Sequence, residues 1–262
     1  MSTSKPRARK ATAFFADRLF ALDAALAAAM QRVVADADPE AVHDLRVNLR
    51  KLRVVGRAAR PLYGRAAVEP LREACKRALD ATGAQREAQV LAQTLSRNPV
   101  HAAHSPADTE RLASINGIRL QLRALATSPA ENDRSIRRLA RRSVDRALRK
   151  VQQRAGEAGD DVESLHALRA AAKQLRYTVE LFQDQCPDLT EVAFAAEAVQ
   201  GRLGRVHDLD DAIAAIGRAQ HLSEARRRAT LAALRARRRR ELSCWKKDKL
   251  SPRLAPLHLP GS

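Results

Sequence analysis

Apolar and polar positions follow the period of an α-helix along nearly the whole chain. Apolar residues recur three or four positions apart, Ala, Leu and Arg dominate, and no sustained period-two run indicates a strand. In the first segment, for example, Phe15, Leu19, Leu22 and Leu26 fall on one face. The pattern predicts an all-α protein whose helices each bury one apolar side.

Glycine and proline residues mark the expected helix boundaries. Asp38-Pro39-Glu40 is a typical helix start, Pro61 and Gly64 should stop that helix, and Gly83 and Gly204 should each divide two short helices. The acids after His207 are expected to begin the second helix of such a pair. The predicted helices cover residues 11–36, 38–60, 67–82, 84–97, 107–126, 132–157, 162–184, 189–203, 205–220 and 222–247, with a loose tail at 251–262.

One helical segment occurs twice. Residues 42–53 read VHDLRVNLRKLR and residues 165–176 read LHALRAAAKQLR, an offset of 123 positions. Matched polar pairs are His43 and His166, Arg46 and Arg169, Arg50 and Lys173, and Arg53 and Arg176; matched apolar pairs are Val42 and Leu165, Leu45 and Leu168, Leu49 and Ala172, and Leu52 and Leu175. Because Gly83 and Gly204 keep nearly the same offset, the pattern predicts duplication of a whole helical unit.

The repeated polar positions form a row of cations on each helix. We define the first stripe as His43, Arg46, Arg50, Arg53 and Arg57, and the second stripe as His166, Arg169, Lys173 and Arg176. His43 to Arg53 spans an arc of roughly 80° and about 15 Å of helix. Like charges on consecutive turns destabilise an isolated helix, and a bound polyanion reverses that effect. Arginine forks pair well with phosphate oxygens, and the histidines predict tighter binding as the pH falls.

The charge balance of the chain supports a polyanionic partner. The 262 residues include 48 Lys plus Arg against 30 Asp plus Glu, a net charge of +18, while 45% hydrophobic residues exclude a disordered polyelectrolyte. Such an excess favours nucleic acid, polyphosphate or an anionic membrane surface. The alternative is a basic surface that serves solubility alone.

The sequence resembles the CHAD domain family over roughly residues 12–220. The resemblance rests on the two H-x-x-R-x-x-x-[RK]-x-x-R segments, on RYTVELF at 176–182 and on LGRVHDLD at 203–210. It implies two four-helix bundles related by pseudo-twofold symmetry, and non-catalytic binding of inorganic polyphosphate in a basic groove, with targeting to polyphosphate granules as one purpose. The implied binding residues are those of both stripes, together with Lys76.

The resemblance also implies a domain organisation. A CHAD-like domain would span residues 1–220, with a first repeat at about 12–97, a linking segment at about 98–131 and a second repeat at about 132–220. Residues 221–262 would form a basic C-terminal helix and tail. Two departures from the family pattern lie outside the stripes: GAQREAQ at 83–89 retains one acid, and Glu197 stands opposite Lys76.

Signatures of catalysis and metal binding are missing from the sequence. It contains no GxxxxGK[ST], GxSxG or HExxH motif and no ExExK strand, so neither an enzyme nor a cofactor is expected. His43 and His166 are surrounded by cations, which disfavours a divalent metal. His101 and His104 have ligand-like spacing, but two loop histidines are weak support for a site.

Nucleic-acid binding is the rival function. A basic run near the C-terminus could contact any phosphodiester backbone; it comprises Arg235, Arg237, Arg238, Arg239, Arg240, Lys246, Lys247 and Lys249. Aromatic residues make up only 3%, and Tyr63, Tyr177, Phe182 and Phe194 are expected in the core, which leaves few stacking surfaces. A basic amphipathic helix on a membrane surface is a third interpretation.

Cysteine usage and the N-terminus favour a cytoplasmic location. Cys75, Cys186 and Cys244 form no CxxC pair and are expected as small apolar residues in a reducing compartment. Asp17, Arg18 and Asp23 interrupt the Ala-rich N-terminal stretch, so neither a signal peptide nor a membrane span is expected.

Overall fold

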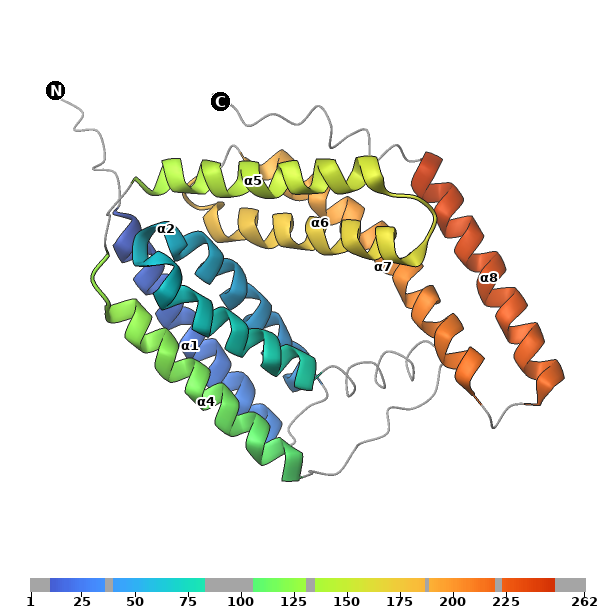
Figure 1. The fold of residues 1–262 in the computed structure, drawn as a ribbon, viewed down its shortest axis with the longest axis horizontal. Helices are drawn as coiled ribbons and strands as arrows, with labels where there is room; N and C mark the ends of the chain where they lie inside the picture. The colour runs from blue at the N-terminus through green and yellow to red at the C-terminus, as the bar shows by residue number, and fades with distance from the viewer. Residues whose placement is uncertain are drawn as a thin grey trace. The chain divides into compact units, whose positions relative to one another are not determined.

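A computed structural model describes residues 10–35, 40–82, 106–130, 135–186, 189–219 and 223–247. Within these ranges the chain forms seven α-helices and no β-strand (Figure 1). An isolated bridge joins Lys10 to Ser135. The predicted all-α class is therefore confirmed. The predicted helix at 84–97, Gly83, His101, His104 and the tail at 251–262 lie outside the described residues.

The helices follow the predicted boundaries closely in most places. They are α1 (Ala11–Val34), α2 (Ala41–Ala81), α4 (Pro106–Thr127), α5 (Ile136–Glu157), α6 (Val162–Phe182), α7 (Thr190–Arg218) and α8 (Glu224–Lys247). Helix α4 begins at Pro106, one residue before the predicted helix at 107–126. Asp161 caps α6, because its side chain accepts a hydrogen bond from the Ser164 amide at 2.8 Å.

Pro61 does not stop the motif helix, contrary to the prediction. The helix continues to Gly64, whose φ of 78° and ψ of 166° kink α2. Leu62 and Tyr63 are 0% and 4% exposed, so burial of two large side chains stabilises the turn that Pro61 weakens. The break falls at Gly64 because a positive φ is strained for residues with a Cβ.

Gly204 does not divide two helices either, and the acids after His207 do not begin one. Helix α7 is continuous from Thr190 to Arg218. Glycine inside a helix costs only about 1 kcal/mol relative to alanine. Leu203, Val206 and Leu209 are each at most 4% exposed, and their burial outweighs that cost.

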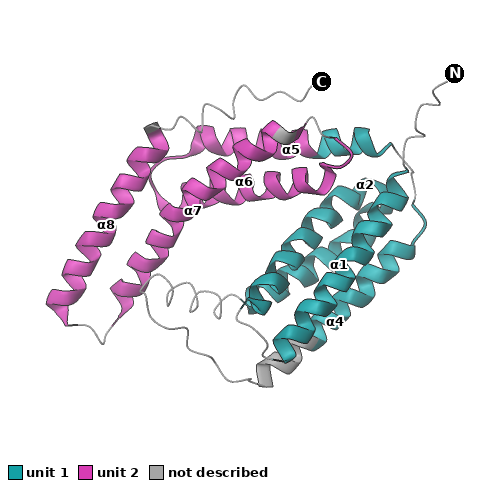
Figure 2. Ribbon diagram, turned by 180° about the vertical axis from the view of Figure 1, so that it is seen from behind, with its two compact units in different colours: residues 1–86, 101–143 teal, residues 87–100, 144–262 magenta. Residues whose placement is uncertain are grey.

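The chain divides into two compact units, drawn in different colours in Figure 2. Unit 1 comprises residues 1–86 and 101–143, and unit 2 comprises residues 87–100 and 144–262, so the boundary falls inside α5. The predicted repeat boundaries and the pseudo-symmetric four-helix bundles remain predictions.

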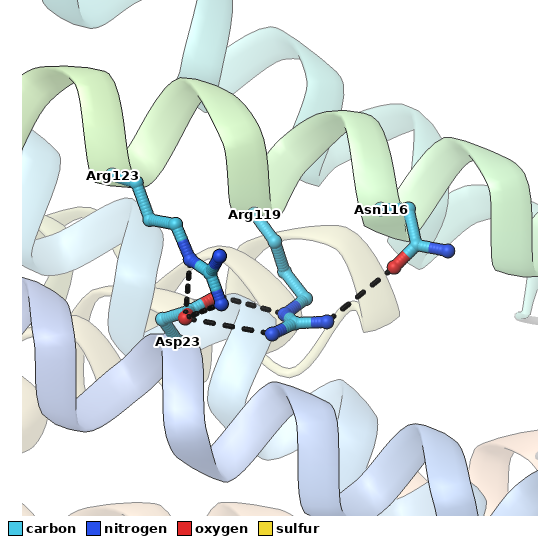
Figure 3. A network of polar contacts seen from close by, with 4 residues as sticks. All are labelled: Asp23, Asn116, Arg119 and Arg123. Atoms are coloured by element: carbon cyan, nitrogen blue, oxygen red, sulfur yellow. Dashed lines mark hydrogen bonds and ion pairs between the residues drawn. The ribbon is translucent and has the colours of Figure 1, made fainter.

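In unit 1, helices α1, α2 and α4 pack against one another. Their contact includes a charged network around Asp23, which is only 6% exposed (Figure 3). The carboxylate accepts hydrogen bonds from Arg119 Nε and Arg123 Nε, both at 2.7 Å. Burial raises the pKa of the Asp23 carboxyl, but these hydrogen bonds outweigh burial and leave the pKa below its ordinary value. Asp23 therefore ties α1 to α4 as a buried anion.

In unit 2, helix α7 packs against both α6 and α8. Arg238 of α8 forms an ion pair with Asp210 of α7, whose side chain is 8% exposed. Leu242 and Trp245 of α8 are also buried. The predicted C-terminal helix is thus attached to α7 by a buried ion pair and by apolar contacts.

Two expectations about apolar residues have different outcomes. Cys75 and Cys186 are buried, as expected of small apolar residues, whereas Cys244 is exposed; all three are free thiols. Burial raises the pKa of the Cys75 thiol to about 12.

The expectation that Phe194 lies in the core is wrong, because its side chain is 67% exposed. Phe194 lies on the face of α7 opposite the buried Val192.

Candidate anion-binding site

The apolar half of the repeated segment packs as predicted. Leu45, Leu49 and Leu52 of α2 are at most 3% exposed, and so are their matched residues Leu168, Ala172 and Leu175 of α6. Val42 differs from its match Leu165, because Val42 is half-exposed and Leu165 is buried. Each stripe therefore lies on a helix that is fixed to its own unit by an apolar face.

The first stripe lies along the first segment of α2, in unit 1. Four of its members are half-buried and Arg57 is exposed. Arg46 donates hydrogen bonds from Nη1 to the Leu79 carbonyl at 2.7 Å and to Thr82 Oγ1 at 2.6 Å. These acceptors lie at the C-terminal end of α2, where carbonyl groups have no helical partner. Arg46 therefore caps a helix end, a role that the sequence pattern did not reveal.

Lys76 lies on the second segment of α2 and is exposed. Glu197 of α7, its counterpart in the sequence repeat, is also exposed.

The second stripe lies along α6, in unit 2. His166 is exposed, and Arg169, Lys173 and Arg176 are half-buried. Arg176 Nε lies 3.3 Å from Glu180 Oε1, and the Arg176 guanidinium stacks 5.0 Å from the Tyr177 ring centre. Arg176 is therefore already engaged by its own helix, which weakens its attraction for an anion.

The N-terminal half of the second stripe meets α7 at His207. The ring centres of His166 and His207 are 5.1 Å apart. His207 Nε2 lies 3.4 Å from Asp211 Oδ2, one turn further along α7. Arg169 reaches the same place, because a Cβ placed on Gly204 would lie 3.8 Å from Arg169 Nε. This buried Nε has no hydrogen-bond partner among the described residues.

His207 is the functional candidate that sequence reasoning missed. Burial, then the charge of Arg169, and then His166 lower the pKa of His207, and the opposing effect of Asp211 and Asp208 does not compensate. The sequence signal was present in LGRVHDLD, but its histidine was assigned to a helix start. Only the contact between α6 and α7 brings it beside His166.

Helix α5 also carries a basic face that the sequence pattern did not single out. Its apolar residues Val144, Leu148 and Val151 are buried. The exposed cations are Arg137, Arg138, Arg142, Arg146, Arg149 and Lys150. Arg149 pairs with Asp145 on the same helix. These cations belong to neither stripe.

The basic run of α8 is partly engaged within unit 2. Arg238 is paired with Asp210 and also donates to the Asp160 carbonyl at 3.0 Å. Lys246 Nζ lies 2.7 Å from Asp160 Oδ2. Exposed cations of the run are Arg235, Arg237, Arg239 and Arg240. Lys249 lies outside the described residues.

These features define an all-α protein with an internal repeat and two cationic stripes backed by buried apolar faces. The profile of the CHAD domain family matches residues 19–217, and the chain belongs to this family. A crystal structure of the CHAD domain from the plant Ricinus communis is similar, with a TM-score of 0.66 and 22% identity over 99% of both chains. At this identity the likeness supports the fold. No curated protein matches the chain.

Neither a metal cluster nor a membrane span is found in the described part of the chain. No three His, Cys, Asp or Glu side chains there come close enough to hold a metal ion. Among the same residues, no helix combines the length and the apolarity that crossing a bilayer requires.

Proposed function

We propose that this protein binds inorganic polyphosphate through its two cationic stripes and does not catalyse a reaction on it. The observation that carries the proposal is the pair of matched rows of His, Arg and Lys, each on a helix anchored by buried leucines. A linear chain of phosphates suits such rows, because it presents regularly spaced negative oxygens that arginine forks and lysine ammonium groups bind. The resemblance to CHAD domains points to the same ligand.

The residues proposed to contact the ligand follow one another along α2 and α6. Arg50, Arg53 and Arg57 follow Arg46 along α2, and Lys173 follows Arg169 along α6. Arg46 and Arg176 interact with acceptors of the protein itself. That both stripes face one basic groove remains a prediction. Attachment to polyphosphate granules in the cytoplasm is the purpose that we propose.

Binding of a nucleic-acid backbone is the second candidate. The exposed arginines of α8 and the basic face of α5 favour it, since a phosphodiester backbone requires little more than positive charge. The buried positions of Tyr63, Tyr177 and Phe182 weigh against single-strand binding, which uses exposed aromatic rings. The exposed Phe194 is one remaining stacking surface.

A direct binding comparison tests the proposal. The full chain is titrated with long-chain polyphosphate, duplex DNA and single-stranded DNA at several salt concentrations. We expect polyphosphate to bind most tightly, with log affinity falling by several units per unit of log salt, as for about six to eight neutralised phosphates. Prolonged incubation should leave the polyphosphate chain length unchanged. Tighter binding of DNA at every salt concentration would assign the site to nucleic acid instead.

A further inference from the structure

His207 lies at the centre of a charged cluster formed entirely within unit 2. His166 and Arg169 approach it from α6, and Asp211 approaches it from the next turn of α7. Two imidazole rings 5.1 Å apart beside a guanidinium form an unusual concentration of groups that carry, or can acquire, positive charge. Asp208 and Asp211 of α7 oppose the lowering of the His207 pKa by burial, Arg169 and His166, but they do not reverse it.

We propose that His166, His207 and Arg169 together form one phosphate subsite, and that binding a phosphate there takes up a proton at His207. The inference rests on the proposed function, because it requires a phosphate chain at the second stripe. It adds His207 to the binding residues. It also predicts that phosphate binding by unit 2 depends on pH more strongly than phosphate binding by unit 1.

The hydrogen-bonding groups of the cluster suit a phosphate. A protonated imidazole donates from both ring nitrogens, and a neutral one donates from a single nitrogen. Arg169 Nε is a buried donor with no acceptor among the described residues, a state that costs free energy until an acceptor arrives. The guanidinium of Arg169 lies directly against this turn of α7, because a Cβ placed on Gly204 would make an ordinary van der Waals contact with Nε at 3.8 Å.

The electrostatics fix the sign of the proton linkage. Without a ligand, burial and then the neighbouring Arg169 and His166 hold the pKa of His207 below its ordinary value, so the imidazole is neutral near pH 7. A bound phosphate adds negative charge beside the same ring and raises that pKa. Between the pKa of the free state and that of the bound state, binding therefore takes up protons and tightens as the pH falls.

The other charges around His207 do not remove this effect. From α6 the facing groups are His166 and Arg169, and on α7 they are Asp208 and Asp211. Helix α8, which also packs on α7, contributes Arg238 paired with Asp210 and Glu241 paired with Arg202 and Arg205. These α8 charges are compensated within the α7–α8 contact. Among the described residues, the charges that act most strongly on the pKa of His207 come from α6 and α7.

The experiment measures polyphosphate affinity and proton uptake between about pH 8 and pH 5.5 at constant ionic strength. Long-chain polyphosphate is the probe, since its internal phosphates keep their charge across this range. Proton uptake comes from calorimetry in two buffers with different ionisation enthalpies. The wild-type chain is compared with H207Q and H207R, and H43Q serves as the matched control because it removes the histidine of the first stripe.

We expect wild-type affinity to rise by up to about tenfold per pH unit for each proton taken up. H207Q should lose most of this rise and most of the proton uptake. H207R should show a weaker pH dependence than wild type, because the positive charge at position 207 then does not titrate. H43Q should retain at least half of the wild-type proton uptake. The helical content of each variant is checked by circular dichroism, and if H207Q unfolds, H207N replaces it with the same expectation.

Two results separate the inference from the function on which it rests. If the wild-type chain fails to bind polyphosphate at every pH, the proposed function is wrong. If the wild-type chain binds polyphosphate, and H207Q takes up as many protons on binding as the wild-type chain, the proton-dependent subsite is wrong. Polyphosphate binding then still stands.

Discussion

Arg46 and Arg169 occupy the same position of the repeated segment, yet they have different roles. Arg46 reaches the end of its own helix and binds Leu79 and Thr82, which satisfies acceptors at a helix terminus. Arg169 instead lies against the middle of α7, beside Gly204 and His207. The comparison shows that a duplicated motif conserves charge and packing but not the use of each side chain.

The largest effect should come from reversing the charges of both stripes together. The variant R50E/R53E/R169E/K173E should weaken polyphosphate binding by about a hundredfold or more, because each charge-assisted hydrogen bond contributes about 1.5 to 3 kcal/mol. The matched control R138E/R142E/R146E/K150E changes the net charge equally on the exposed face of α5. Equal losses in the two variants would show that overall charge, and not the stripes, attracts the ligand.

The contrast between the two arginines is tested by single substitutions. R46A should lower the free energy of unfolding of unit 1 by about 1.5 to 3 kcal/mol, since it removes a charged donor from Thr82 and Leu79. R169A should leave stability nearly unchanged and weaken binding about tenfold. The measurements are urea unfolding and binding isotherms. A stable R46A protein that loses as much affinity as R169A would make the two positions equivalent.

Ion pairs hold helices together in both units, and their removal allows a second comparison. D23A leaves Arg119 and Arg123 of α4 without their shared acceptor and should cost about 1.5 to 3 kcal/mol of stability. D210A should cost a similar amount in the α7–α8 contact. Hydrogen exchange should show faster exchange in α1 and α4 for D23A, and in α8 for D210A. Faster exchange across all helices in both variants would mean that the units do not unfold separately.

The smallest expected effect is the pH dependence of stability without a ligand. The pKa of His207 is lower in the folded chain than in the unfolded chain, so unfolding takes up a proton below about pH 6.5. The stability that the folded chain gains by keeping His207 neutral is fully present above about pH 6.5. It is lost as the pH falls through the pKa that His207 has in the folded chain. H207Q should therefore lose less stability than wild type between about pH 6.5 and 5, measured by urea unfolding. An identical decline in both proteins would contradict the lowered pKa.

The sequence by itself determined the helical class, most helix ends, and the two cationic stripes with their buried apolar faces. These features depend on local periodicity, because residues three or four positions apart share a helix face whatever surrounds the helix. The same local reasoning wrongly predicted that Pro61 and Gly204 interrupt their helices. There, burial of neighbouring leucines, which is a property of the packed unit, outweighed a residue's intrinsic preference.

Only the tertiary structure decided which distant residues meet. Asp23 reaches Arg119 across 96 positions, and His207 meets His166 because α6 and α7 pack side by side. No periodicity encodes such a contact, since it depends on how two apolar faces are aligned along their helices. The acceptors of Arg46, the approach of Arg169 to Gly204 and the lowered pKa of His207 all follow from that alignment, and so does the difference between two stripes that the sequence made alike.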